Sequence, residues 1–199
     1  MSEDKTKPNR RQQILETLAH ELETHPGTRI TTAGLAKAVG VSEAALYRHF
    51  ASKAKMFEAL IDFAEDSVFG LINKVLAQET TVSGKCEKIL QLLLGFAERN
   101  PGITRILLGD ALVGENERLR TRVSQFFERI RTQLRQILRE ANLEGDQRAA
   151  ITIDAAADAM MTLVEGKMSQ FARSGFQESP TQYWEQHWPI LAQGLFRPN

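Results

Sequence analysis

The sequence contains a single cysteine, no long apolar run and no net charge. Cys86 cannot form an intramolecular disulfide, so we expect it to pack as a small apolar side chain. The densest apolar stretch, 89–97, is interrupted by Gln91 and is far shorter than the ~18 residues that a membrane span needs. The first residues, MSEDKTKPNRR, lack the apolar core of a secretion signal. These absences predict a cytoplasmic protein with no membrane partner.

Motifs that carry enzymatic or metal chemistry are also missing. Four scattered histidines (His20, His25, His49 and His187) form no His-Glu-x-x-His or Cys/His cluster. No glycine-rich phosphate loop follows a strand, because no segment shows convincing strand alternation. Glu165 lies in an apolar segment and would suit a ligand pocket, although an exposed or capped carboxylate is the simpler interpretation. We predict neither an enzyme nor a bound cofactor or metal.

Helical periodicity covers almost the whole chain and predicts an all-α fold. We expect a disordered polar arm at 1–8, a polar loop at 142–149 and a break at 79–83. A proline after an asparagine cap favours a helix start, so Asn100-Pro101 should end one helix and begin the next. Ser179 and Pro180 should begin the last helix in the same way. The expected helices lie at about 9–24, 52–78, 84–99, 101–112, 116–141, 152–174 and 180–196, in addition to two short ones between 30 and 50.

Residues 30–57 form the most informative segment, because they predict two short helices joined at a glycine. Leu35, Ala36 and Val39 have the spacing of a buried helical stripe. Gly40 carries no Cβ and suits a tight turn at positive φ. Ser42 is a good N-cap for the second helix, which presents small residues together with Tyr, Arg and His. Small residues allow close approach to a groove, and the polar ones can bond phosphates or base edges. The pattern indicates a helix-turn-helix.

Charge supports this interpretation. Residues 26–57 contain five basic residues and one acidic residue, Glu43, so this window carries +4 in a chain that sums to zero. A compact basic patch on a neutral protein favours local contact with double-stranded DNA over diffuse binding to polyanions.

The same segment resembles the DNA-binding domain of the TetR family from about residue 10 to residue 60. The resemblance rests on Ile30-Thr31-Thr32, Leu35-Ala36, Gly40-Val41-Ser42, Leu46-Tyr47-Arg48-His49-Phe50, Ser52-Lys53 and Met56-Phe57. It implies a three-helix DNA-binding domain at 9–52 and a larger helical dimerisation and regulatory domain at 53–199. We expect phosphate contacts from Tyr47 and Lys53. The complete set of candidate DNA-binding residues is Arg10, Arg11, Thr31, Thr32, Ser42, Ala44, Ala45, Tyr47, Arg48, His49 and Lys53.

The last two expected helices favour a homodimer. Residues 155–171 are rich in Ala, Gly and Met, and Tyr183, Trp184 and Trp188 follow. Small residues permit close helix crossing, and aromatic residues are enriched at interfaces. One helix-turn-helix usually contacts too little DNA for specific binding. Such proteins therefore commonly bind a palindrome as a twofold dimer, with one helix-turn-helix on each half-site. TetR-like proteins pair through these two helices. Pro189 should kink the last one.

Further segments resemble one subfamily, the nucleoid occlusion factors. They are Asn9-Arg10-Arg11, GFAERNPGITRIL at 95–107, ERLR at 117–120, QFFERI at 125–130, LRQILRE at 134–140 and FARSGF at 171–176. The resemblance implies a nucleoid-associated protein that inhibits assembly of the cell-division protein FtsZ when it occupies DNA. It also implies an FtsZ-facing surface on the fourth and fifth helices, at Phe63, Leu92, Gly95, Arg99 and Asn100.

Simpler roles exist for these five residues. Phe63 and Leu92 would suit a core, and Arg99 with Asn100 would suit a helix end and a cap. Two features also depart from the subfamily: Leu71 stands where an arginine is expected, and GDALVGE at 109–115 lacks the usual His and Met-Phe. The alternative function is a ligand-responsive TetR-type repressor, in which a small molecule in the C-terminal domain changes the spacing of the recognition helices.

Overall fold

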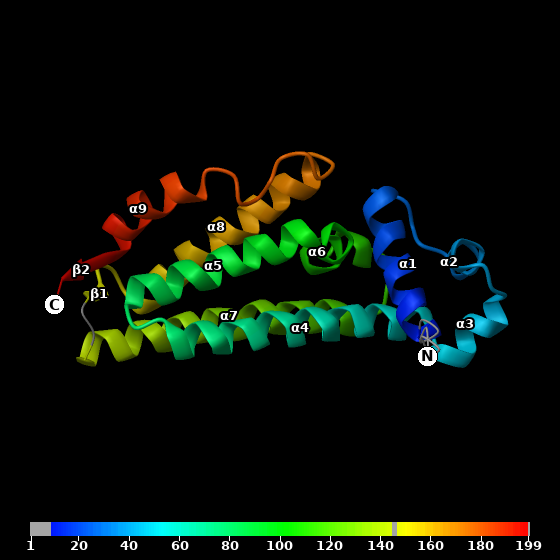
Figure 1. Ribbon diagram of the computed structural model, residues 1–199, viewed down its shortest axis with the longest axis horizontal. Coiled ribbons are helices and arrows are strands. Elements are labelled where there is room, and N and C mark those ends of the chain that lie inside the picture. The colour runs from blue at the N-terminus through cyan, green and yellow to red at the C-terminus, as the bar shows by residue number, and fades with distance from the viewer. Residues whose placement is uncertain (1–8, 145–146, 199) are drawn as a thin grey trace, which may run out of the picture.

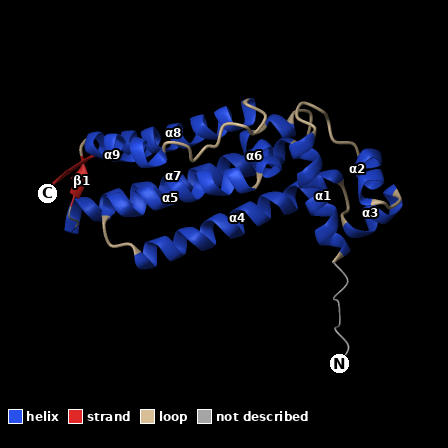
Figure 2. Cartoon of the chain, turned by 45° about the horizontal axis from the view of Figure 1, so that its top comes forward, coloured by secondary structure: helices blue, strands red, loops and turns tan. Residues whose placement is uncertain are grey.

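The computed structural model describes residues 9–144 and 147–198, so the arm expected at 1–8 lies outside the described residues. The molecule is elongated: a small helical domain forms one end, and long helices run side by side away from it (Figure 1). Helices make up most of the described part, and the two short strands lie at the far end (Figure 2). The all-α prediction is confirmed.

The elements follow one another in the order α1 (Arg10–Thr24), α2 (Thr32–Val39), α3 (Glu43–His49), α4 (Lys53–Gln78), α5 (Val82–Arg99), α6 (Pro101–Leu108), the 3-10 helix η1 (Asp110–Leu112), α7 (Glu117–Glu144), β1 (Gln147–Ala149), α8 (Ile153–Arg173), α9 (Trp184–Leu195) and β2 (Phe196–Pro198).

The predicted helix-turn-helix is confirmed, including the turn at Gly40 and the Ser42 cap. The Thr31 hydroxyl accepts a hydrogen bond from the Gly34 amide and begins α2. Gly40 ends α2 at φ +77°, a conformation that a residue with a side chain adopts only at a cost. The Ser42 hydroxyl then accepts from the Ala45 amide and begins α3. The two helices are therefore fixed by local chemistry that the sequence contains.

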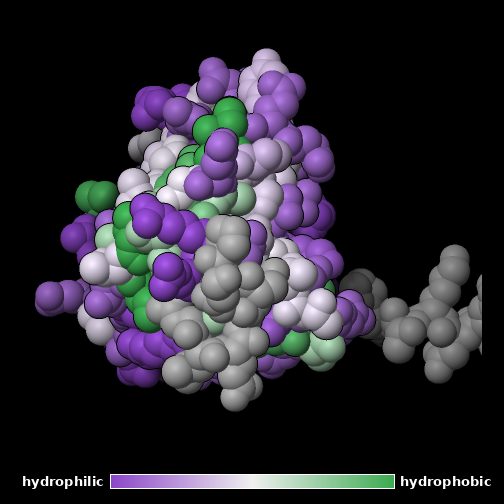
Figure 3. Space-filling model, turned by 90° about the vertical axis from the view of Figure 1, so that its left-hand side faces the viewer, coloured by the Kyte–Doolittle hydropathy of each residue, from purple (hydrophilic) through white to green (hydrophobic). Residues whose placement is uncertain are grey.

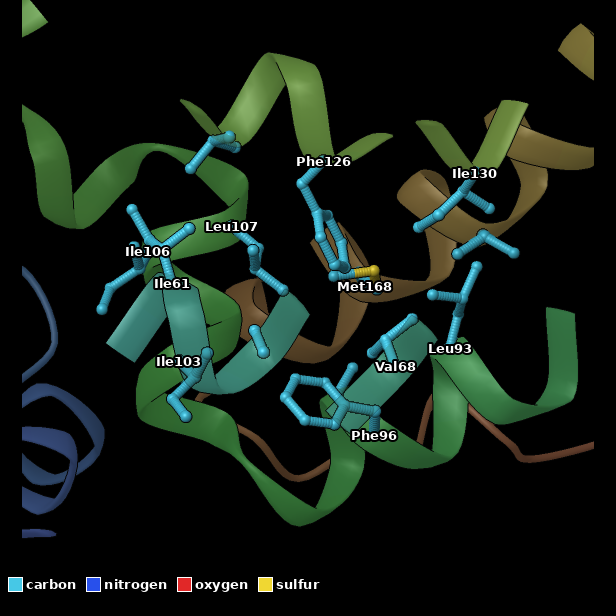
Figure 4. Packing of buried hydrophobic residues seen from close by; sticks show 14 of the residues in the cluster. Ile61, Val68, Leu93, Phe96, Ile103, Ile106, Leu107, Phe126, Ile130 and Met168 are labelled. Carbon is cyan, nitrogen blue, oxygen red and sulfur yellow. The ribbon is translucent and has the colours of Figure 1, made fainter. Parts of the chain in front are cut away.

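Long helices α4, α5, α7 and α8 share one core with α6. Figure 4 shows Phe126 of α7 and Met168 of α8 pointing into the space that Val68, Leu93 and Phe96 fill from the other side. All five side chains are buried. Full burial of each such side chain contributes roughly 1.5–3 kcal/mol. This cluster therefore holds together the rod, the body formed by α4, α5, α6, α7 and α8.

The domain formed by α1–α3 is attached to this rod where α1 crosses α6. Gly102 lies so close to α1 that a Cβ built on it would be 2.0 Å from the Ala19 carbonyl oxygen. Arg105 is 4% exposed, and its guanidinium donates to the Leu22 carbonyl at 2.7 Å and to the Asp110 carboxylate at 2.7 Å. α6 therefore holds the C-terminal end of α1 by close packing and by charged hydrogen bonds.

Three expected helix boundaries were wrong. The helix begun at Pro101 stops at Leu108 rather than at 112, because Gly109 takes φ +83° and a short 3-10 turn follows. The Asn100 side chain does not cap it: its amide donates back to the Phe96 carbonyl at 2.8 Å. α7 extends to Glu144, into the segment expected to be a polar loop.

The last helix starts at Trp184 instead of Pro180. The Ser179 hydroxyl, expected as its cap, donates to the carboxylate of Glu98 on α5, and Thr181 donates to the same group at 3.0 Å. Tyr183 then takes φ +62° immediately before the helix. The bonds to Glu98 hold this segment in a turn, so α9 begins later than expected. Pro189 lies inside α9, which continues beyond it.

The absence of strands was also predicted wrongly, although the strands are small. β1 pairs antiparallel with β2, and Arg148 stands opposite Arg197. Each strand is only three residues long, which is too short to show alternation in the sequence.

Candidate nucleic-acid interface and partner surface

The outer surface of α3 is the candidate recognition surface. Leu46 is fully buried and anchors the helix, whereas Ala44, Tyr47 and Arg48 are exposed. Tyr47 keeps 46% of its surface accessible although it is a large aromatic residue. An anchored helix with a small-residue and polar outer face can enter a major groove.

Neighbouring elements hold this helix in place. The Thr32 hydroxyl donates to the Glu43 carboxylate at 2.8 Å and ties α2 to α3. The Arg11 guanidinium of α1 lies 4.3 Å from the centre of the Phe50 ring and donates to the His49 carbonyl at 3.4 Å. Arg11 therefore links the start of α1 to the end of α3 while it remains exposed.

Lys53 is bonded inside the protein. Its ammonium donates to the Ile30 carbonyl at 2.8 Å and lies 2.5 Å from the Glu115 carboxylate, and its side chain is 17% exposed. The predicted phosphate contact of Lys53 stays a prediction. The donor that we expect to make it is the backbone amide at the start of α4, because the internal bonds engage the side-chain ammonium.

The candidate DNA-binding residues come together at one end of the molecule. The contacts above connect the start of α1, both helices of the helix-turn-helix and the start of α4, which lie together at the right of Figure 1. Sequence reasoning missed Glu115 and Arg29, whose side chains lie 4.0 Å apart in this region. No local signal could have paired them, since they belong to loops far apart in the sequence.

The candidate partner residues lie along α4 and α5. Phe63 is 49% exposed, although its ring centre lies 6.3 Å from that of the buried Phe96. Leu71 is 37% exposed further along the same helix, and Leu92 is half-buried. Packing in the core therefore does not explain why Phe63 is so exposed.

At the end of α5, Arg99 is exposed and Gly95 is buried. The atoms nearest to a Cβ built on Gly95 belong to the Arg99 guanidinium, at 3.4 Å or more, so the arginine lies across the glycine. Arg99 and Asn100 line a groove of about 220 Å³ whose other wall is α1, at Glu16, His20 and Glu23. This part of the candidate surface thus touches the DNA-binding domain directly.

A larger trough of about 880 Å³ lies between α6, α7 and α8. Leu107, Leu112 and Phe127 contribute apolar lining, and Arg131 and Glu165 line it at 3.8 Å from one another. Burial raises the pKa of the Glu165 carboxyl above its usual range. Glu165 therefore borders a cavity and is also paired with an arginine.

Within the part of the chain that the structure describes, no group of three or more His, Cys, Asp or Glu side chains is arranged to hold a metal ion. None of the described helices has the length and apolar character of a membrane span.

Two family models match the chain. Residues 14–60 match the model described as bacterial regulatory proteins of the tetR family. Residues 79–196 match the SlmA-like model described as a tetracyclin repressor-like C-terminal domain. The predicted resemblance over the DNA-binding domain is confirmed, and the second match covers more than half of the chain.

Curated relatives share the full length of the chain. The nucleoid occlusion factor SlmA of Marinomonas sp. is 53% identical over 189 residues, covering 95% of this chain and 96% of the relative. The protein of the same name from Shewanella denitrificans is 52% identical over 191 residues, covering 96% and 97%.

Solved structures share the fold at low identity. The MbdR regulator from Azoarcus sp. superposes with a TM-score of 0.77 at 18% identity, covering 94% of this chain and 99% of that one. The ketosteroid regulator KstR2 of Mycobacterium tuberculosis gives 0.76 at 18% identity, covering 96% and 97%. The chain belongs to the TetR family and, within it, to the nucleoid occlusion factors named SlmA.

Proposed function

We propose that this protein binds palindromic DNA as a homodimer and, when bound, inhibits assembly of FtsZ over the nucleoid. The observation that carries the proposal is identity above 50% across nearly the whole length of relatives named nucleoid occlusion factor. This similarity includes α4, α5 and the C-terminal helices, and is therefore not limited to a helix-turn-helix that all TetR-type proteins share.

The proposed DNA face consists of the outer surface of α3 with the start of α2 and the start of α4. Ser42, Ala44 and Ala45 approach the groove, while Tyr47 and the first amides of α4 bond phosphates. Genome-wide binding in cells tests this function. Many dispersed palindromes, depleted near the replication terminus, are expected. One or two sites beside the protein's own gene would instead identify a local repressor.

The proposed dimer pairs α8 and α9 of two copies. The exposed side of α8 carries Ala155, Ala159, Thr162 and Gly166, and Ile190 of α9 is 72% exposed. Figure 3 looks onto the end that holds α9 and shows hydrophobic surface gathered along one side of it. Exposed small residues on one helix and an exposed isoleucine on the other suit close helix packing across a twofold axis.

Substituting Gly166→Arg should convert the dimer to a monomer. A Cβ at this position meets nothing within 4 Å, so the variant can fold, but the long charged side chain blocks close pairing. Sedimentation at micromolar concentration should give about half the wild-type mass. Gly70→Arg, at an equally open position on α4, is the matched control and should remain dimeric. A dimeric Gly166→Arg would place the interface elsewhere.

The proposed FtsZ-binding surface comprises Phe63, Leu92, Gly95, Arg99 and Asn100. Phe63 supplies exposed apolar area, and Arg99 offers a guanidinium that can pair with a carboxylate of the partner. The groove shared by Arg99 and α1 supports a dependence on DNA, since a shift of the DNA-binding domain would change the wall of that groove.

Reversing the charge at Arg99 should abolish FtsZ binding and leave DNA affinity unchanged, because the reversal repels an acidic partner group and lies away from the groove contacts of α3. Sedimentation with FtsZ polymers and titration of palindromic DNA measure the two affinities for Arg99→Asp. Arg139→Asp, an exposed arginine near the far end of α7, is the control. Leu71→Arg should strengthen FtsZ binding. Normal polymer binding by Arg99→Asp would remove this surface from the proposal.

The second candidate function is a ligand-responsive repressor, and the trough of about 880 Å³ between α6, α7 and α8 favours it. Its lining mixes apolar residues with the Arg131–Glu165 pair, which suits an amphipathic small molecule. If such a molecule released DNA at saturating concentration and FtsZ assembly stayed unaffected, this function would replace the first.

A further inference from the structure

Glu115 connects the rod to the DNA-binding domain through ionic contacts. It precedes α7, and its side chain is only 9% exposed. Its carboxylate lies 2.5 Å from the ammonium of Lys53 and 4.0 Å from the guanidinium of Arg29. A carboxylate with so little solvent access interacts strongly with a nearby cation, because the effective dielectric there is lower than that of water.

The Lys53 ammonium extends this contact to the helix-turn-helix. It donates to the Ile30 carbonyl at 2.8 Å, and Ile30 immediately precedes the Thr31 cap of α2. Lys53 also lies at the first position of α4. One chain of contacts, Glu115 to Lys53 to Ile30, therefore ties the start of α2 to the start of α4 and to the loop before α7.

Palindrome recognition requires the two recognition helices of a dimer to keep a fixed separation. Each helix-turn-helix must then be held at one position on its rod. We infer that Glu115 is a positioning residue for DNA binding: through Lys53 it sets the helix-turn-helix at the position that fits both half-sites. This inference rests on the proposed palindrome-binding function.

The test compares Glu115→Gln with wild type on the cognate palindrome and on a scrambled duplex of equal length, over a range of salt concentrations. Glutamine keeps the shape of the side chain and removes the charge. The expected result is roughly tenfold weaker palindrome binding, with affinity for the scrambled duplex and the salt slope unchanged. The double variant Lys53→Met/Glu115→Gln should bind the palindrome no more weakly than Lys53→Met, because both changes break one contact.

Glu117→Gln is the matched control, since it removes an exposed negative charge two residues away, and it should bind both duplexes as wild type does. Tighter binding of both duplexes by Glu115→Gln would overturn the inference, because Glu115 would then sequester Lys53 from phosphates. A salt slope lowered by about one in Lys53→Met would overturn it too. If wild type itself does not distinguish the palindrome from the scrambled duplex, the proposed function fails instead.

Discussion

Replacing Gly102 with valine should destabilise the protein by about 3 kcal/mol or more and weaken its DNA binding. Even the first added carbon would lie 2.0 Å from the Ala19 carbonyl oxygen and 3.2 Å from the Leu22 Cβ. The nearest atom belongs to the backbone, so no side-chain rotation can relieve the overlap. The helices α1 and α6 must separate, and overpacking of this kind usually costs 1–3 kcal/mol and sometimes more.

Urea unfolding of the purified protein measures this effect at a fixed protein concentration. Gly70→Ala is the matched control. Gly70 is exposed on α4, and a Cβ added there would meet nothing within 4 Å. Alanine in a helix interior should stabilise the protein by roughly 0.5–1 kcal/mol relative to glycine. Equal unfolding midpoints for wild type and Gly102→Val would contradict the close contact between α1 and α6.

Substituting Arg105→Met should cost about 3 kcal/mol for a different reason. The guanidinium is 4% exposed, and it donates to the Leu22 and His25 carbonyls, at 2.7 and 3.3 Å, and to the Asp110 carboxylate. Methionine fills similar volume but leaves the carbonyls at the end of α1 without this donor. Each buried polar group left unsatisfied costs roughly 1–3 kcal/mol.

An exposed arginine shows what the same substitution costs without burial. Arg118 is 69% exposed and lies 3.9 Å from Glu58, so Arg118→Met should change stability by less than about 1 kcal/mol. The difference between the two variants in urea unfolding isolates the contribution of burial. Indistinguishable variants would mean that Arg105 does not hold the end of α1.

Local chemistry made the DNA-binding domain predictable. The Ser42 cap, the turn at Gly40 and the buried stripe from Leu35 all depend on neighbours within a few residues, and the structure confirms them. The recognition helix α3 could be predicted from the same local signals. The buried Leu46 alone is enough to fix which face of this short helix points outward.

Long-range contacts explain what the sequence did not reveal. The true start of α9 depends on Glu98, whose carboxylate accepts hydrogen bonds from Ser179 and Thr181, more than 80 positions away. The Lys53–Glu115 pair likewise joins distant segments, and it gives the side chain of an expected DNA-binding residue an internal ionic partner. Periodicity and capping rules describe one segment at a time and cannot identify such partners.

On the proposed function, DNA occupancy licenses inhibition of FtsZ assembly. Light scattering by FtsZ polymers measures this, with the protein added alone, with its cognate palindrome, and with a scrambled duplex at equal concentration. We expect a strong loss of scattering with the palindrome and little loss in the other two samples. Full scattering at saturating palindrome occupancy would contradict it.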